Sequence, residues 1–196
     1  MHAFKRRLAK YSRWLHIYVS MTSFVIVFFF AVTGWTLNHA ERFSGGERLR
    51  KAAGSVDTQW TGAAAESAKT RIADAIRSGA GVHGAVTDFR VDDDSVSLTF
   101  KGPGYSADAL IDRKTGKYDV TESRLGAIAV LNDLHKGRDT GGVWKAVIDV
   151  SAGLLTFISL TGLILIYYIH KHRLAGVILL AAGAAMAGVL YMVWVP

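Results

Sequence analysis

The chain has 196 residues, of which 51% are hydrophobic, and a formal net charge of +7. This hydrophobic share is above that of ordinary soluble domains, and the sequence contains no cysteine. Iron–sulfur clusters, thiolate chemistry and disulfides are therefore excluded, which leaves histidine as the ligand type for any redox centre. We expect the positive charge to reflect membrane topology and contact with anionic membrane lipid, and we expect no nucleic-acid partner.

The first apolar segment covers residues 15–37 and carries no charge. At ~1.5 Å per residue it spans a ~30 Å hydrocarbon core, which predicts a transmembrane helix. It is too long for the apolar region of a signal peptide and no small-residue cleavage pattern follows it, so we expect it to be retained.

The region after this span predicts a small α+β domain. Residues 41–61 are polar and Gly-rich, and we interpret them as a linker or a weakly ordered entry. Apolar residues at helical spacing predict a helix over 63–78. Strand-like runs separated by turn sequences follow at 87–91, 95–101, 105–111 and 117–121. The economical arrangement is a helix packed on a small antiparallel sheet.

Two further apolar segments predict two more transmembrane helices. Residues 150–169 are uncharged, and their helix is expected to begin near Val143. Residues 174–195 are rich in Ala and Gly and end in Tyr191 and Trp194, which are typical interface anchors. This third span would pack internally or against a second copy of the chain, as a homo-oligomer.

The distribution of basic residues predicts the orientation. Five of them precede the first span, and Lys171 and Arg173 follow the second. The positive-inside rule then places the N-terminus in the cytoplasm, and the central domain and C-terminus outside a bacterial inner membrane. The predicted parts are 1–39 (basic N-terminus and first helix), 40–134 (extracytoplasmic domain with linkers), 135–170 (outer histidine segment and second helix) and 171–196 (inner turn and third helix).

Four histidines stand at the ends of the first two spans. His16 and His39 are ~35 Å apart along a straight helix, so they cannot ligate one iron. Antiparallel spans would place His16 beside His170 at the inner face and His39 beside His135 at the outer face. These pairs predict two haem b groups with axial histidines, His172 being the alternative to His170. The competing interpretation is that each histidine is an interfacial residue.

The two histidine segments approximately repeat each other. In the first, Leu15-His16 leads to Thr33-Gly34 and His39; in the second, Leu134-His135 leads to Thr161-Gly162 and His170. Because the copies cross the membrane in opposite directions, they resemble an inverted repeat.

Gly34 and Gly162 lie inside apolar helices, where Ala would be favoured by up to ~1 kcal/mol. We expect either a small-residue helix contact or clearance for a porphyrin face. Hydroxyl and amide groups that could hold the second ring nitrogen of a ligating histidine are those of Thr33, Thr36, Asn38, Thr161 and Tyr167.

Two arginines lie close in sequence to the proposed histidine ligands. Arg13 and Arg138 are predicted to bind haem propionates, with contact to lipid phosphate as the alternative.

Glycines 137, 141 and 142 predict a break between a short helix carrying His135 and the second span. His2 and His83 have no partner in this scheme and are expected to be solvated.

Two kinds of segment resemble a known family. The final hairpin of a PepSY domain is similar to "ALIDRKTGKY" (109–118). PepSY-associated transmembrane helices resemble the flanking segments "WLHIYVSMTSFVIVFFFAVTGWTLNH" and "LNDLHKGRDTGGVWKAVIDVSAGLLTFISLTGLILIYYIHKHR". The resemblance covers most of the chain and implies a relation to larger ferric-siderophore reductases of the bacterial inner membrane, which bind haem through such histidines.

The expected function is transmembrane electron transfer, as in a haem-dependent membrane oxidoreductase. Quinol or a cytoplasmic reductase would donate electrons, because no Gly-rich nucleotide motif is present. The acceptor would be a ferric chelate or a redox protein such as a flavoprotein. Two alternatives stay open: a membrane-anchored PepSY module that binds or regulates a partner without redox activity, and a transport component for iron or another metal.

Overall fold

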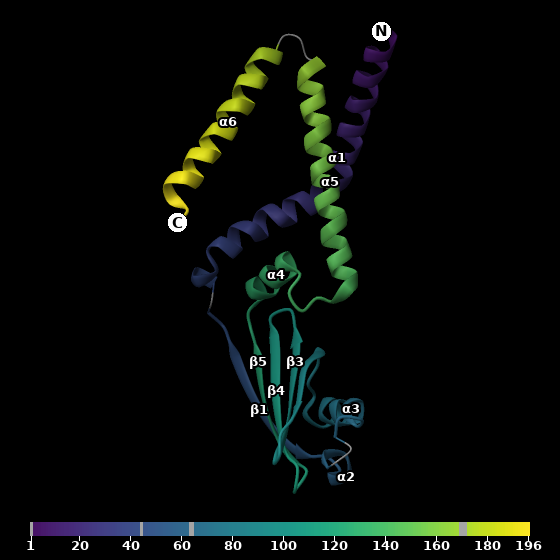
Figure 1. Cartoon of the computed structure of the whole chain (residues 1–196), viewed down its shortest axis with the longest axis vertical. Helices are drawn as coiled ribbons and strands as arrows, with labels where there is room; N and C mark the ends of the chain where they lie inside the picture. Colours follow the sequence, from purple (N-terminus) through teal and green to yellow (C-terminus); the bar gives the residue numbers. More distant parts are fainter. Residues whose placement is uncertain (1, 44, 63–64, 169–171) are drawn as a thin grey trace. The chain divides into compact units, whose positions relative to one another are not determined.

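The computed structural model describes the chain except for residues 1, 44, 63–64 and 169–171 (Figure 1). The elements are, in order, α1 (His2–Asn38), η1 (Ala40–Phe43), β1 (Arg48–Ser55), α2 (Thr58–Thr61), α3 (Lys69–Ala80), β2 (Ala85–Val91), β3 (Ser95–Gly102), β4 (Tyr105–Asp112), β5 (Lys117–Arg124), α4 (Ala127–Lys136), α5 (Gly141–Tyr168) and α6 (Arg173–Trp194). They form two compact units, 1–28 with 149–196 and 29–148.

In the part of the chain that the structure describes, three helices are long and apolar enough to cross a membrane: α1 from Arg7 to Asn38, α5 and α6. Each predicted span corresponds to one of these helices. Their burial is opposite to that of a soluble core, since Ser23 and Ser151 are 1% exposed while Met21 and Val25 are more than 70% exposed. Small polar residues at helix contacts and apolar residues on the outside are typical of helices that pack in lipid.

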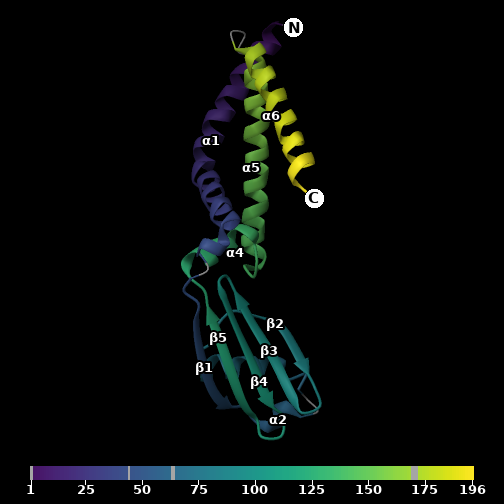
Figure 2. The same cartoon turned by 90° about the vertical axis from the view of Figure 1, so that its left-hand side faces the viewer.

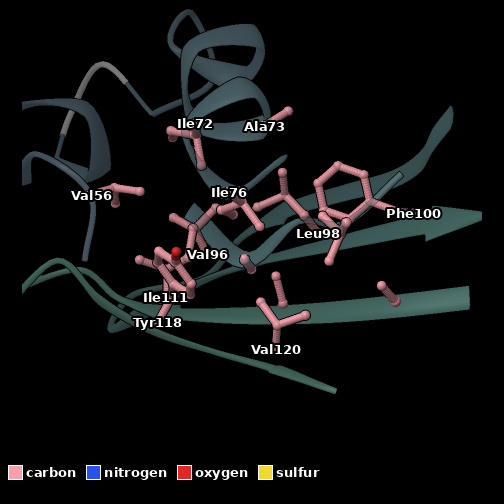
Figure 3. Packing of buried hydrophobic residues seen from close by; sticks show 14 of the residues in the cluster. Val56, Ile72, Ala73, Ile76, Val96, Leu98, Phe100, Ile111, Tyr118 and Val120 are labelled. Atoms are coloured by element: carbon pink, nitrogen blue, oxygen red, sulfur yellow. The ribbon is translucent and has the colours of Figure 1, made fainter. Parts of the chain in front are cut away.

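The sheet has five antiparallel strands in the order β1-β5-β4-β3-β2 (Figure 2). Every second residue of β3, β4 and β5 is buried, as a half-covered sheet requires. Ile72 and Ile76 of α3 are fully buried in the same cluster as Val96, Leu98 and Phe100 of β3 (Figure 3). The predicted helix on an antiparallel sheet is confirmed.

The first strand corrects the interpretation of residues 41–61. Arg48 to Ser55 form β1, which pairs with β5 along its whole length, instead of a weakly ordered entry. Nearly all of its side chains are exposed and several are charged, so it lacks the apolar alternation that identifies a strand. The helix that we expected over 63–78 also begins later, at Lys69, and ends at Ala80.

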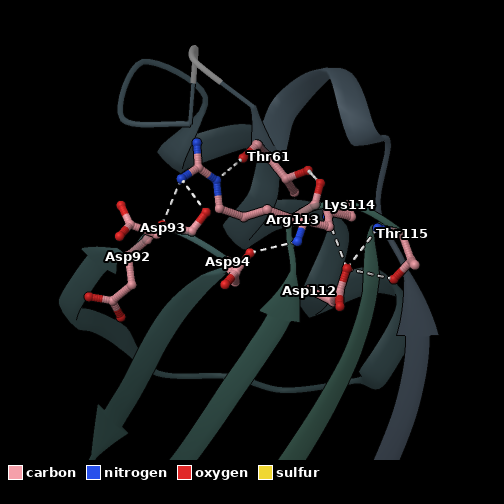
Figure 4. A network of polar contacts seen from close by, with 8 residues as sticks. All are labelled: Thr61, Asp92, Asp93, Asp94, Asp112, Arg113, Lys114 and Thr115. Carbon is pink, nitrogen blue, oxygen red and sulfur yellow. Dashed lines mark hydrogen bonds and ion pairs between the residues drawn. The ribbon is translucent and has the colours of Figure 1, made fainter.

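The turn before β5 has the geometry that its sequence predicts. The Asp112 carboxylate accepts hydrogen bonds from the amides of Lys114 and Thr115 and from the Thr115 hydroxyl (Figure 4). These bonds, the Thr115 amide first, hold the pKa of Asp112 below its ordinary value. Gly116 has φ +70°, and a Cβ there would lie 2.3 Å from the Val56 carbonyl oxygen, so only glycine fits.

Arg113 fastens this turn to two other segments. Its guanidinium donates to the carbonyl oxygens of Thr61 and Asp92 (Figure 4). It also donates to that of Gly62. Lys114 forms an ion pair with Asp94 at 2.8 Å. The aspartates at 92–94 therefore belong to a turn between β2 and β3, as the sequence predicts. The structure adds that Arg113 and Lys114 hold this turn.

Candidate functional site: two histidine–threonine–glycine arrangements

His135 lies in the last turn of the short helix α4, which the sheet holds in place. The Asp133 carboxylate accepts a hydrogen bond of 2.8 Å from the amide of Gly104, in the turn between β3 and β4. On the other side of α4, the Trp144 indole donates to the Leu134 carbonyl at 2.8 Å. Gly137 ends α4 with φ +68°. The predicted break between a His135 helix and the second span is confirmed.

The His135 ring contacts the C-terminal part of α1. Its Nδ1 lies 2.7 Å from Thr33 Oγ1. A Cβ on Gly34 would lie 3.4 Å from His135 Cε1, so the glycine faces the imidazole edge. The Phe30 ring meets the imidazole edge-on, with the ring centroids 5.2 Å apart. We call this arrangement of His135, Thr33 and Gly34 the His135 site.

The other compact unit contains the same arrangement. His16 Nδ1 lies 3.0 Å from Thr161 Oγ1. A Cβ on Gly162 would lie 3.2 Å from His16 Cε1. We call this arrangement of His16, Thr161 and Gly162 the His16 site. Both glycines therefore make room for an imidazole ring. The two roles that we expected for them, a small-residue helix contact and clearance for a porphyrin face, stay predictions.

The hydrogen bonds of the threonines assign the histidine tautomers. Thr33 Oγ1 lies 2.6 Å from the Phe29 carbonyl oxygen, and Thr161 Oγ1 lies 2.9 Å from that of Ile158. A carbonyl oxygen only accepts, so each hydroxyl must use its single proton there. The hydroxyl oxygen then accepts from the imidazole, which places the proton on Nδ1. In neutral His135 and His16 the lone pair is consequently on Nε2, the nitrogen that is free for a metal.

His39 has the same tautomer but a different partner. Its Nδ1 lies 3.0 Å from the Trp35 carbonyl oxygen, one helical turn earlier, and must donate to it. Its ring lies against Trp35 at 5.1 Å. These contacts do not join it to His135, so the pairing of the two on one iron stays a prediction. His170 lies outside the described residues, and His172 is an exposed residue just before α6.

Three other residues of the predicted sites, Thr36, Arg138 and Arg13, form no side-chain hydrogen bond or ion pair with the histidines in the part of the chain that the structure describes. Thr36 hydrogen-bonds with the buried amide of Asn132 at 2.8 Å, a partner that the sequence did not indicate. Arg138 lies 3.9 Å from the Asp133 carboxylate, and Arg13 is exposed. Their roles as propionate partners stay predictions.

His83 is exposed, as expected for a solvated residue, and the structure adds a ring contact that we did not predict. Its ring stacks on Tyr105 with the centroids 3.7 Å apart, although its side chain is exposed. Burial raises the pKa of Tyr105, against the opposing effect of its hydrogen bond from the His83 amide. The sequence contains no local signal for this contact between a loop and a strand.

Each site offers one histidine as a ligand, and a haem iron is a centre that takes such ligands. Among the residues that the structure describes, no three His, Cys, Asp or Glu side chains converge on one point. A haem iron needs only axial protein ligands, and neutral imidazoles with a fixed Nδ1–H suit that role. His16 and His135 meet this requirement at two separate places.

Together, the three apolar helices and the α+β domain between the first two define a membrane protein with an inserted domain. The chain belongs to the PepSY_TM-like family, whose family model matches residues 10–196. The resemblance to the PepSY-associated transmembrane family is thereby confirmed. Comparison with curated proteins and with solved structures found no match to either.

Proposed function

We propose that this protein carries electrons across a bacterial inner membrane through two b-type haems held by its membrane histidines. The observation that carries the proposal is the contact of His16 Nδ1 with the Thr161 hydroxyl and of His135 Nδ1 with the Thr33 hydroxyl, which leaves Nε2 of each ring as the nitrogen that can ligate iron. Haem, when bound, supplies a one-electron redox centre. The family match supports a membrane protein related to PepSY proteins, and the redox role is our addition.

The residues of the chain have separate tasks in this proposal. His16 with His170, or with His172, ligates the inner group, and His39 with His135 ligates the outer one. Arg13 and Arg138 neutralise the propionates near the ends of the spans. The apolar helices exclude water around the ligands, and the sheet docks or covers the acceptor.

The donor and the acceptor must come from outside the chain. The sequence has no nucleotide-binding motif, so quinol or a cytoplasmic reductase supplies the electron. A ferric chelate or a redox protein such as a flavoprotein receives it on the side of the sheet domain. The resemblance of the membrane segments to those of ferric-siderophore reductases is our reason for proposing a ferric acceptor.

Haem content is the first test. Protein purified in mild detergent should show a b-type spectrum and about two haems per chain in a pyridine haemochrome assay. His16→Ala and His135→Ala should each remove a different haem, whereas His83→Ala, outside the spans, should remove none. His39→Ala combined with His135→Ala should lose no more haem than either alone, because both act on one iron. A colourless protein from haem-replete cells would overturn the proposal.

Electron transfer is the second test. The protein is reconstituted in liposomes. A ferric chelate is placed on the side of the sheet domain, and a reductant is supplied on the opposite side. The wild type should reduce the chelate, and His16→Ala should abolish reduction while the outer haem remains bound. If His16→Ala transfers electrons at the wild-type rate, the inner haem is not on the path. A protein that moves iron without changing its oxidation state would instead be a transport component.

A further inference from the structure

The two histidine sites are reciprocal. His16 of α1 meets Thr161-Gly162 of α5, while His135, on the helix before α5, meets Thr33-Gly34 of α1. Each site has the same two contacts, a hydroxyl at Nδ1 and a glycine at Cε1. The approximate repeat of the sequence therefore has a structural counterpart: the histidine of each segment contacts the Thr-Gly pair of the other segment.

The threonine hydroxyls are held by hydrogen bonds within their own helices, independently of the histidines. Thr33 and Thr161 are 2% and 5% exposed, and each binds a carbonyl of its own helix. A β-branched side chain that is held in this way has one rotamer, so its oxygen offers a lone pair in a set direction. An imidazole that reaches this oxygen must present Nδ1–H to it.

We infer that Thr33 and Thr161 are positioning residues that fix the tautomer and ring orientation of His135 and His16. This inference rests on the proposed function, because it assigns the nitrogen that faces the haem iron. The hydroxyl also satisfies an N–H that would otherwise lie unpaired in an apolar segment. Gly162 and Gly34 set how closely the ring approaches, since Cε1 occupies the space next to each of them.

The chain offers matched controls for both threonines. Thr22 of α1 and Thr156 of α5 also donate to a carbonyl of their own helix, that of Tyr18 and that of Ala152, but they are exposed. A Cβ on Gly153 of α5 would meet no atom within 4 Å, in contrast to one on Gly162. Thr→Val keeps the shape and removes the hydroxyl, and Thr→Ser keeps the hydroxyl.

The first arm of the test needs no haem. Full-length protein with 15N-labelled histidine, prepared from haem-depleted cells, should show His16 and His135 at neutral pH as Nδ1–H tautomers by NMR. His16→Ala and His135→Ala assign the signals. Thr161→Val should change only the His16 signal and Thr33→Val only that of His135. Thr22→Val and Thr156→Val should change neither.

The second arm uses the haem-loaded protein. Thr33→Val and Thr161→Val should each speed the loss of one haem to excess apomyoglobin by roughly 10–100-fold, the usual effect of losing such a partner. The midpoint potential of that haem should rise, because a ligand without the Nδ1–H bond is less basic. Thr→Ser should restore both values. Gly162→Ala should perturb the same haem as Thr161→Val, and Gly153→Ala should perturb none.

The outcomes separate the two proposals. If the histidine variants remove haem but the Thr→Val variants leave tautomer, haem loss and potential unchanged, the positioning role is wrong and the proposed function stands. If no haem binds but the NMR signals change as expected, the positioning role stands and the proposed function is wrong. Unchanged NMR signals in both Thr→Val variants overturn the inference whatever the haem content.

Discussion

Glu122 is a carboxylate buried inside the sheet domain, with 1% of its side chain exposed. It lies between the guanidinium groups of Arg50 and Arg124, which are about half exposed, and both donate to it. Burial raises the pKa of Glu122, but the hydrogen bonds and charges of Arg124 and Arg50 lower it by more, so the pKa lies below its ordinary value. Arg50 also donates to the Ala80 carbonyl and so connects β1 to the end of α3.

Glu122→Gln should therefore destabilise the sheet domain at neutral pH, by about 1–3 kcal/mol, because it removes the charged acceptor of two hydrogen bonds. Since the folded pKa is depressed, the stabilisation is present above the unfolded pKa and is lost as the pH falls through the folded pKa. Thermal melts of the β signal by circular dichroism should show a wild-type advantage at pH 7 that shrinks toward pH 3. Asp119→Asn, exposed on the same strand, is the control. A pH-independent difference would contradict this account.

Among the elements, α4 connects the sheet to the histidine of the His135 site. The turn between β3 and β4 fits against it closely, since a Cβ on Gly104 would lie 2.5 Å from Val130 Cγ2. The Asp133 carboxylate of α4 accepts a hydrogen bond from the amide of Gly104. The domain therefore has a structural role for His135 that is independent of any acceptor, because it holds the helix that carries the ring.

Asp133→Ala should loosen α4, because the Gly104 amide loses its charged acceptor. Hydrogen exchange measured by mass spectrometry should become roughly tenfold faster in residues 127–136, as expected for a loss of about 1.4 kcal/mol in local stability. Asp133→Asn keeps a carbonyl acceptor and should exchange nearly as the wild type does. Unchanged exchange of α4 in the alanine variant would show that the hairpin contact does not hold it.

At the scale of the whole molecule, the orientation depends on charges at the ends of the spans. The basic residues before the first span and Arg173 after the second both favour the cytoplasmic side. Because the chain has no cysteine, a single introduced cysteine reports the side on which it lies.

Thr121→Cys, exposed on β5, should react with a membrane-impermeant maleimide in intact spheroplasts. Leu8→Cys, near the N-terminus, should react only after permeabilisation or in inverted vesicles. Labelling is read by the mass shift of the purified protein, with the cysteine-free wild type as the control. The opposite pattern would reverse the predicted topology and with it the direction of electron flow.

The three long apolar helices, four of the five strands, the Asp112 turn and the family were predictable from the sequence alone. These features depend on uncharged length, periodicity and local turn chemistry, which are properties of neighbouring residues. Strand β1 needed the tertiary structure, because an exposed, charged edge strand is defined by its partner β5. The tertiary structure also decided which threonine meets which histidine, since these residues are 102 and 145 positions apart. A hydrogen bond between two such side chains exists only after the segments that carry them have packed together.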